Sequence, residues 1–195
     1  MSVRRSDHYN PSCSVSYDQG VRSRHDRDEI LAAAVDVAHT DGLNQLSFGR
    51  VAKRLDIADR TVVYYFATKH DLITAVLIEL GAGLQVLLAD AVTGRADDHQ
   101  QLVTMLWPTL SHADHAATTR TYLEAIGLAA AGTDPYTALV PALIDEWLRW
   151  TAERIDHADP NEQAAAAVAI IDGLLVLQHV APDGTAELAI RHLSP

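Results

Sequence analysis

Apolar residues recur at intervals of three and four along most of the chain, which is the spacing of helices with one buried face. Residues 26–40 are an example, because Ile30, Leu31, Ala34, Val37 and Ala38 fall on one side of such a helix. No alternation of apolar and polar residues typical of strands occurs. We therefore predict an all-α fold of eight to ten helices, at about 26–40, 48–55, 59–65, 68–92, 99–111, 116–131, 136–156, 160–180 and 185–193.

Local sequence patterns support the ends of several of these helices. Gly42 follows the first helix, where a residue of positive φ ends a helix at low cost. Ser47 is a favourable N-cap for the helix at 48–55. Thr68 and Asp71 have the spacing of a capping box at the start of the helix at 68–92. Pro160 suits the first turn of the helix that it begins.

The helices at 48–55 and 59–65 are separated by three residues, which is the arrangement of a helix-turn-helix. On the second helix, Val62 and Phe66 are four residues apart and are expected to point into a small core. Tyr64 and Tyr65 then lie on the other sides of a helix of less than two turns, where their hydroxyls suit phosphate contact. Arg60, near the helix start, could reach base edges in the major groove. The pattern alone still leaves open a helical domain that binds no DNA.

The charge of the chain is unevenly distributed. The net charge of −11 by itself disfavours a nucleic-acid partner. However, residues 1–69 hold 10 Lys and Arg against 9 Asp and Glu, whereas residues 70–195 hold 5 against 17. Both lysines of the chain, Lys53 and Lys69, lie in the first part. Such asymmetry favours a local polyanion-binding region at the helix-turn-helix.

Several short segments resemble a known family in both order and spacing. They are Ile30-Leu31 with Ala33-Ala34, Gly42-Leu43, Leu46-Ser47-Phe48, residues 51–55 (Val-Ala-Lys-Arg-Leu) and residues 61–69 (Thr-Val-Val-Tyr-Tyr-Phe-Ala-Thr-Lys). Over residues 27–69 the chain is similar to the N-terminal domain of the TetR (tetracycline repressor) family. Residues 169–174 (Ala-Ile-Ile-Asp-Gly-Leu) also resemble a pattern of that family's last long helix.

The resemblance implies a homodimeric repressor that binds a palindromic operator and leaves it when a small molecule occupies the C-terminal body. The DNA-contacting residues that it implies are Ser47 and Arg50 on the backbone, Arg60, Thr61, Tyr64 and Tyr65 on the recognition helix, and Lys69 on a phosphate. Asp56 and Ala58 depart from the family's turn glycine and Ser or Thr cap, and Val63 replaces a frequent tyrosine. Because Asp tolerates left-handed geometry, the turn is still expected to form.

We expect three parts: a flexible N-terminal arm at 1–25, a DNA-binding domain at 26–69, and a ligand-binding and dimerisation domain at 70–195. The arginines of the arm could add phosphate affinity, or the arm could simply be disordered. The single cysteine, Cys13, excludes an internal disulfide. With no secretory signal and no stretch of about eighteen uncharged apolar residues, a cytoplasmic protein without a membrane partner is expected.

The body is expected to hold an apolar cavity for a small, mostly hydrophobic effector. Large apolar residues occur there among many Ala and Gly residues, so tight filling is not assured. Because the body has few basic residues, a neutral or cationic ligand is favoured over an anionic one. The predicted lining is Leu84, Gln85, Leu88, Met105, Leu106, Leu110, His112, Tyr122, Ile126 and Trp147, with His115 and Glu124 as further polar candidates.

A homodimer is predicted through the helices at 136–156 and 160–180. The second is apolar on nearly every side, and one small monomer rarely covers such a helix, whereas a four-helix interface between two copies does. The predicted contacts are Val140, Ile144, Leu148, Ile170, Ile171, Leu174 and Leu175.

Other functions find little support in the sequence. No nucleophile motif, phosphate loop or metal-ligand cluster occurs, so no enzyme activity, cofactor or metal is expected. Two alternatives stay open: an all-helical ligand-binding or scaffold protein that has lost DNA binding, and, more weakly, a helical-bundle enzyme.

Overall fold

The computed structural model describes residues 25–193, and within that range the chain is helical, with no β-strand. The helices are α1 (Arg27–Asp41), α2 (Phe48–Leu55), α3 (Asp59–Tyr65), α4 (Lys69–Ala91), α5 (His99–Leu110), α6 (Ala116–Ala130), α7 (Tyr136–Ala152), α8 (Pro160–Val180) and α9 (Thr185–Arg191), with 3-10 turns η1 (Leu43–Gln45) and η2 (Ala113–His115). The predicted all-α fold is confirmed. The end of α7 differs most from prediction, because the chain leaves the helix at Glu153.

The helix caps that the sequence predicts are present in the structure as hydrogen bonds. The Ser47 hydroxyl accepts the N–H of Arg50 at 3.4 Å and begins α2. At the start of α4, Thr68 and Asp71 each accept the other's backbone N–H at 3.0 Å. Asp56 ends α2 in the left-handed region, at φ 54° and ψ 45°, so the aspartate takes the conformation that a turn glycine would supply. These contacts fix where the helix-turn-helix begins and bends.

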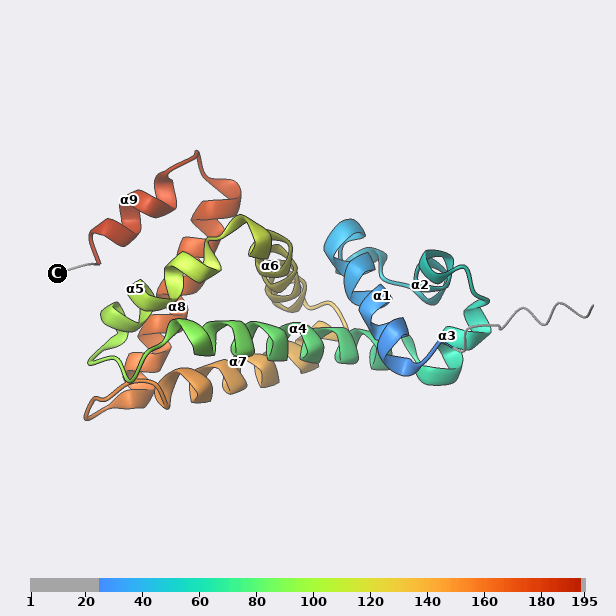
Figure 1. Ribbon diagram of the computed structural model, residues 1–195, viewed down its shortest axis with the longest axis horizontal. Coiled ribbons are helices and arrows are strands. Elements are labelled where there is room, and N and C mark those ends of the chain that lie inside the picture. Colours follow the sequence, from blue (N-terminus) through green and yellow to red (C-terminus); the bar gives the residue numbers. More distant parts are fainter. Residues whose placement is uncertain (1–24, 194–195) are drawn as a thin grey trace, which may run out of the picture.

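The molecule is elongated, with the three short helices α1–α3 at one end and α9 at the other (Figure 1). The 23-residue α4 begins beside α3 and runs along the body with α7 next to it. α6 lies between α1 and the helices of the far end, and it packs against α1, α7 and α8. Thus α4 and α6 both connect the helix-turn-helix to the body.

Two apolar cores follow one another along the molecule. The first joins α1–α3 to the beginning of α4, as far as Leu77, and includes Ala125 of α6 and Val140 of α7. The second lies in the far half of the body, between α5, α8 and the later part of α4, from Leu84 onward. Because α6 and α7 contribute to the first core, the helix-turn-helix domain is packed onto the body rather than tethered to it.

The far end of the body is closed by backbone pairing between two loops. Ala96, between α4 and α5, donates its N–H to the Arg154 carbonyl at 2.8 Å. Its carbonyl accepts the N–H of Asp156 at 2.7 Å, so the two loops form a parallel β-bridge between Ala96 and Ile155. Both Ala96 and Ile155 are fully buried. The C-terminal ends of α4 and α7 are therefore tied together.

By length and composition, α4 and α8 could each cross a membrane. Each carries one carboxylate in the middle of its apolar run, Glu79 in α4 and Asp172 in α8. Both helices pack against several others in the bundle. The same length and composition are typical of the core helices of a helical bundle, so the two helices are weak evidence for a membrane.

Candidate DNA-binding surface and ligand cavity

The seven-residue α3 separates a buried side from an exposed one as predicted. Val62 is buried in the first core, as is Phe66 just after the helix. Arg60 is exposed, Val63 is 41% exposed and Tyr64 is 82% exposed. A surface helix that presents a cation, a phenol and a branched apolar side chain can contact phosphates, base edges and thymine methyl groups.

The two adjacent tyrosines, which the sequence treats alike, have different environments. Tyr65 is half-buried and its hydroxyl donates to the carbonyl of His25 at 3.0 Å. The rings of Tyr64 and Tyr65 meet edge to face, with centroids 5.0 Å apart. Tyr65 therefore holds the chain before α1 and supports the ring of Tyr64, whereas Tyr64 projects outward.

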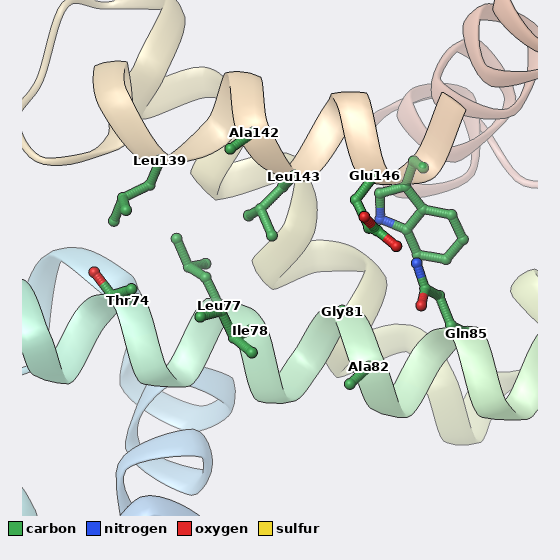
Figure 2. A pocket seen from close by; sticks show the side chains of 11 residues that line it. Thr74, Leu77, Ile78, Gly81, Ala82, Gln85, Leu139, Ala142, Leu143 and Glu146 are labelled. Atoms are coloured by element: carbon green, nitrogen blue, oxygen red, sulfur yellow. The ribbon is translucent and has the colours of Figure 1, made fainter. Parts of the chain in front are cut away.

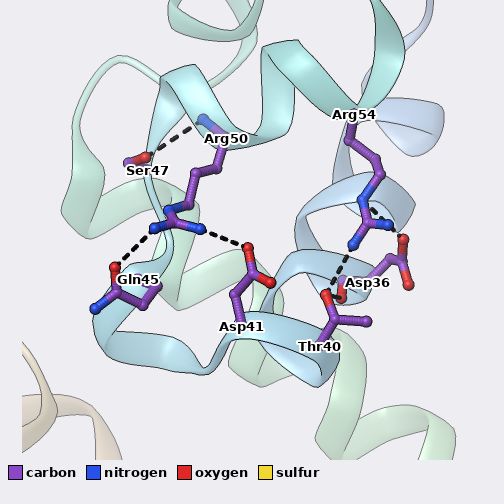
Figure 3. Close-up of polar contacts among 7 residues, drawn as sticks. All are labelled: Asp36, Thr40, Asp41, Gln45, Ser47, Arg50 and Arg54. Atoms are coloured by element: carbon purple, nitrogen blue, oxygen red, sulfur yellow. Dashed lines mark hydrogen bonds and ion pairs between the residues drawn. The ribbon is translucent and has the colours of Figure 1, made fainter.

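Two arginines of α2 are engaged in pairs with α1 and the turn after it (Figure 3). The Arg50 guanidinium lies 2.7 Å from the Asp41 carboxylate and also donates to Gln45 at 3.0 Å. Arg54 pairs with Asp36 at 3.1 Å and donates to Thr40 at 2.7 Å. These pairs join α2 to α1, so a phosphate that binds Arg50 would compete with Asp41.

Four other cations of this domain are exposed and form no ion pair with any residue in the described range: Arg27 on α1, whose guanidinium lies over the Phe66 ring, Lys53 on α2, Arg60 on α3 and Lys69 at the first position of α4. Lys53 was missed as a site residue by sequence reasoning, since its exposed position on α2 becomes evident only from the packing. Of the other predicted contacts, Ser47 caps α2 through its hydroxyl, and Thr61 is half-buried in the first turn of α3.

α6 and α7 hold the turn between α1 and α2 from the body side. The Glu124 carboxylate of α6 accepts the backbone N–H of Leu43 at 2.9 Å and that of Asn44 at 3.2 Å. The Tyr136 hydroxyl at the start of α7 donates to the Leu43 carbonyl at 3.4 Å. The expectation that Glu124 orients a ligand is therefore wrong, because its carboxylate binds the turn between α1 and α2.

Two small internal cavities and one open groove lie side by side along α4. The inner cavity is lined by α4, α5, α6, α7 and α8, and the middle one by α4, α6 and α7. Each has a volume of about 30 Å³, room for about one water molecule. The groove between α4 and α7 has about 430 Å³ and is walled by apolar side chains with Gln85 and Glu146 at one end (Figure 2). Trp147 borders all three spaces.

Most of the predicted cavity residues are brought together, but not all of them. Leu84, Leu88, Leu106, Leu110, Tyr122 and Trp147 line the inner cavity, and Gln85 lines the groove. Met105 packs against the second core and Ile126 against the first, so neither faces these spaces. His112 is exposed in the turn between α5 and α6, beside Asp114. These three assignments are wrong because the periodicity of apolar residues does not indicate which face of a largely apolar helix points into the bundle.

The inner cavity also contains a polar pair that sequence reasoning missed. The Tyr122 hydroxyl of α6 donates to Oδ1 of Asp172 on α8 at 2.9 Å. Burial raises the pKa of Asp172 above its ordinary value, and the hydrogen bond from Tyr122 partly offsets that rise. Burial likewise raises the pKa of Tyr122, with a contribution from the nearby Asp172 charge. The missed part of the lining is completed by Trp150, Thr151, Val168, Ile171 and Leu175.

Comparisons with known proteins agree with this geometry. The family description "Bacterial regulatory proteins, tetR family" matches residues 30–76, from α1 into α4. Residues 30–76 are therefore similar to the N-terminal domain of TetR-family regulatory proteins.

Solved structures of similar fold cover most of this chain. A transcriptional regulator from Rhodococcus sp. Rha1 has a TM-score of 0.69 at 22% identity, over 87% of this chain and 94% of that one. The multidrug binding protein EbrR in complex with imidazole has a TM-score of 0.65 at 27% identity, over 88% and 90%. EbrR in complex with proflavin has a TM-score of 0.64 at 25% identity, over 86% and 97%. No curated protein matches the sequence.

The structure changes which residues of this chain could meet a second copy. Val140 is buried in the first core, and Leu174 and Leu175 in the second, so these three predicted dimer contacts are not accessible. Ile171 lines the inner cavity. The exposed side of α8 instead carries a stripe of small and apolar residues, and α9 adds one large residue: Ala165, Ala169, Gly173, Val176, Val180 and Leu188. Ile144, Leu148 and Ile170 are half-buried.

Within the described residues, no three His, Cys, Asp or Glu side chains gather as metal ligands. The predicted arm, with Arg4, Arg5, Arg22, Arg24 and Cys13, lies outside that range except for His25.

Proposed function

We propose that this protein is a cytoplasmic, homodimeric transcriptional repressor of the TetR family that binds a palindromic operator and leaves it when a small, mostly hydrophobic ligand enters the body. The observation that carries the proposal is the exposed side of α3. A helix of seven residues that leaves Arg60, Val63 and Tyr64 uncovered is suited to a partner surface rather than to a core.

Each proposed DNA contact has a chemical role. Arg60 reads base edges, Thr61 assists it at the helix start, and Val63 meets a thymine methyl group. Phosphates are contacted by Lys53, Tyr64 and Lys69, by Ser47 at the start of α2, and by Arg50 once it exchanges Asp41 for a phosphate. Tyr65 acts on DNA through its neighbour Tyr64, whose ring it supports.

The homodimer is proposed to form through the exposed stripe of α8 together with α9. Small residues at Ala165, Ala169 and Gly173 let two α8 helices approach closely, and Val176 and Val180 supply apolar area. Two-fold symmetry would then place the two recognition helices about one DNA turn apart, roughly 34–36 Å.

Ligand release is supported by the position of the middle cavity between the two cores. Its walls come from the first core at Leu77 and Ala125 and from the second at Leu84. A ligand that enlarges this space would separate the cores. α6 would convey the change, because Tyr122 lines the cavities and Glu124 holds the turn of the DNA-binding domain two residues later.

The functional division of the chain that we propose is an arm at 1–25, DNA binding at 26–69 and ligand binding with dimerisation at 70–195. EbrR, the relative at 27% identity, is a multidrug binding protein seen with imidazole and with proflavin. A body that receives small aromatic molecules is consistent with the apolar lining found here.

A gel-shift assay on the DNA upstream of the protein's own gene tests the proposal. The parent should shift this DNA at a lower concentration than unrelated DNA of equal length and base composition. Tyr64→Ala and Arg60→Ala should weaken the shift, whereas Arg191→Ala, at the far end of the molecule, should not. A parent that binds small molecules but shifts neither DNA would instead indicate a ligand-binding protein that has lost DNA binding. A reporter gene under the same upstream DNA should rise when the protein is removed.

A further inference from the structure

Within residues 25–193, the linings of the inner and middle cavities carry one acidic side chain and no basic one. Their linings consist of apolar side chains, two indoles, Tyr122, Gly81 and the hydroxyls of Thr118 and Thr151, with Asp172 as the single charged group. No Lys, Arg or His among the described residues lines either space. The adjoining groove adds Glu146 and no basic side chain. In the groove, Glu146 is paired with Arg149, so Asp172 is the one carboxylate among these linings without a basic partner in the described residues.

Asp172 has unused hydrogen-bonding capacity in this setting. An ionised carboxylate offers about four acceptor positions. In the described part of the chain, Asp172 accepts one side-chain hydrogen bond, that from Tyr122 to Oδ1. Burial raises its pKa, which means that the charged form lacks a compensating partner. A partner that brings positive charge would supply the missing stabilisation.

Aromatic rings surround the same space. Trp147 and Trp150 meet edge to face with centroids 5.5 Å apart, and both line the inner cavity with Tyr122. The Arg154 guanidinium already lies 3.6 Å from the centroid of the Trp150 ring, which shows that this indole accepts a cation on its face. Arg154 is held there by its hydrogen bond to the Trp150 carbonyl at 2.8 Å and does not line the cavity. Indole faces and a half-buried carboxylate together attract organic cations.

We propose that the cavity beside Asp172 is the effector site and that it selects lipophilic organic cations, with Asp172 as counter-ion and Trp147, Trp150 and Tyr122 as the aromatic lining. The inference rests on the proposed function in placing the effector in the body, and it adds the chemical class of the ligand.

Trp147 is the residue whose movement opens this site. It borders the groove, the middle cavity and the inner cavity, and the groove shares Leu77, Gly81 and Leu143 with the middle cavity. The inner and middle cavities, each of about 30 Å³, cannot hold an organic molecule as they stand. When the Trp147 indole turns aside, the groove of about 430 Å³ becomes continuous with the space beside Asp172.

Two ligands that differ only in charge give the test. Benzyltrimethylammonium and neopentylbenzene have the same shape, with a quaternary nitrogen in one and a carbon in the other. A purely apolar cavity would favour neopentylbenzene, because the ammonium group must give up its hydration. Calorimetry and quenching of tryptophan fluorescence should show the parent binding the cation about tenfold or more tightly than the hydrocarbon. Proflavin serves as a second, planar cation.

Two variants separate the charge of Asp172 from its structural contact. Asp172→Asn keeps the shape and can still accept from Tyr122, so it should weaken both cations about tenfold or more while changing neopentylbenzene affinity by less than about threefold. Tyr122→Phe removes the hydrogen bond but keeps the carboxylate, so it should retain the preference for the cation. If neither cation binds the parent, if the hydrocarbon binds as tightly as its cationic partner, or if Tyr122→Phe abolishes the preference, the proposal is wrong.

These measurements are made without DNA, so they do not depend on repression. If the parent binds the cations through Asp172 but shifts no DNA, the proposed function fails and the cation site stands. If the parent shifts its upstream DNA and Asp172→Asn leaves cation affinity unaltered, the proposed function stands and the cation site fails. Where both hold, Asp172→Asn should bind the DNA like the parent and resist release by benzyltrimethylammonium or proflavin.

Discussion

Glu124 accepts the backbone N–H of Leu43 at 2.9 Å across 81 residues of sequence, which makes it a direct polar contact between the body and the DNA-binding domain. Gly42, next to Leu43, has a φ of 92°, and a Cβ placed there would lie 3.2 Å from both Glu124 carboxylate oxygens. The glycine therefore serves the turn in two ways: it adopts the positive φ that ends α1, and it lets the carboxylate approach.

Loss of the Glu124 carboxylate should loosen this turn specifically. In Glu124→Ala, the amides of Leu43 and Asn44 should exchange hydrogen faster than in the parent, and the free energy of unfolding should fall by about 1–3 kcal/mol, as for hydrogen bonds to a charged group. Hydrogen exchange followed by NMR measures the first effect and denaturant titration the second.

Glu79→Ala is the control, because Glu79 is an exposed carboxylate on α4. It should change the unfolding free energy by less than about 0.5 kcal/mol. Unaltered exchange at Leu43 and Asn44 in Glu124→Ala would show that the packing of α1 against α6, rather than the carboxylate, holds the turn.

DNA binding should depend steeply on salt and on the exposed cations. Affinity should fall on the order of a hundredfold or more between about 50 and 200 mM salt, because several phosphates are neutralised. Lys69→Ala should weaken binding to all sequences alike and reduce the salt slope, whereas Arg60→Ala should also relax the base preference. Fluorescence anisotropy with operator and scrambled DNA measures both effects. Equal affinities for parent and both variants would remove these residues from the DNA contacts.

Helix bounds could be predicted closely because their causes are local. Ser47 and the Thr68–Asp71 pair hydrogen-bond within three residues, and Asp56 takes a left-handed turn through its own backbone freedom. The contacts that could not be predicted from the sequence are those between elements far apart in the chain. Nothing near Glu124 indicates that its partner is the backbone of Leu43, and nothing near Tyr122 indicates that it meets Asp172 on α8.

The proposed dimer predicts a clear effect for Val176 and Val180. These residues are 44% and 76% exposed on α8, where a partner helix would cover them. Replacing both by Asp should turn the dimer into a monomer at micromolar concentration, because two carboxylates would lose their hydration in an apolar interface. Sedimentation velocity measures the change.

Val86→Asp is the matched control, since Val86 is 70% exposed but lies on α4. This variant should sediment like the parent. A parent that is already monomeric, or a Val176→Asp, Val180→Asp double variant that remains dimeric, would place any interface elsewhere.

The same uncertainty about faces explains why the dimer contacts were partly misassigned. α8 is apolar on nearly every side, so its sequence shows that it is buried but not which side faces the chain's own core. Leu174 and Leu175 face the second core, whereas Ala169 and Gly173 face outward. Gly and Ala contribute little to a pattern of hydrophobic positions, although they allow two helices to approach most closely.

Asp172→Asn should raise the stability of the protein at neutral pH. The pKa of Asp172 is higher in the folded chain than its ordinary value of 3.8. The stability that this carboxyl contributes is therefore present when it is protonated and is lost as the pH rises through its folded-state pKa. Asn does not titrate, so the free energy of unfolding of the variant should exceed that of the parent at pH 7, with a difference that shrinks as the pH falls towards 4.

Denaturant titrations at several pH values give this comparison, with Asp145→Asn on the exposed side of α7 as control. Among the residues lining the inner cavity, Tyr122 is the other titratable group, and its raised pKa keeps it protonated throughout the range. Curves for parent and Asp172→Asn that run parallel from pH 4 to pH 7 would show that Asp172 titrates normally. A greater stability of the variant would mean that the half-buried carboxylate costs folding free energy, as is common at functional sites.

The pairing of Ala96 with Ile155 determines where the molecule can bend. Because the two loops are joined at the end farthest from α3, a rotation of α4 would have the β-bridge as its pivot and would shear the first core, where the beginnings of α4 and α7 pack together. α4 has 23 residues, a length of about 34 Å, so a rotation of about 5° around that pivot would carry Lys69 through about 3 Å. A shift of that size exceeds the tolerance of a hydrogen bond to a phosphate. Under the proposed function, a side-chain rearrangement near the middle of α4 would thereby be amplified at the end proposed to contact DNA.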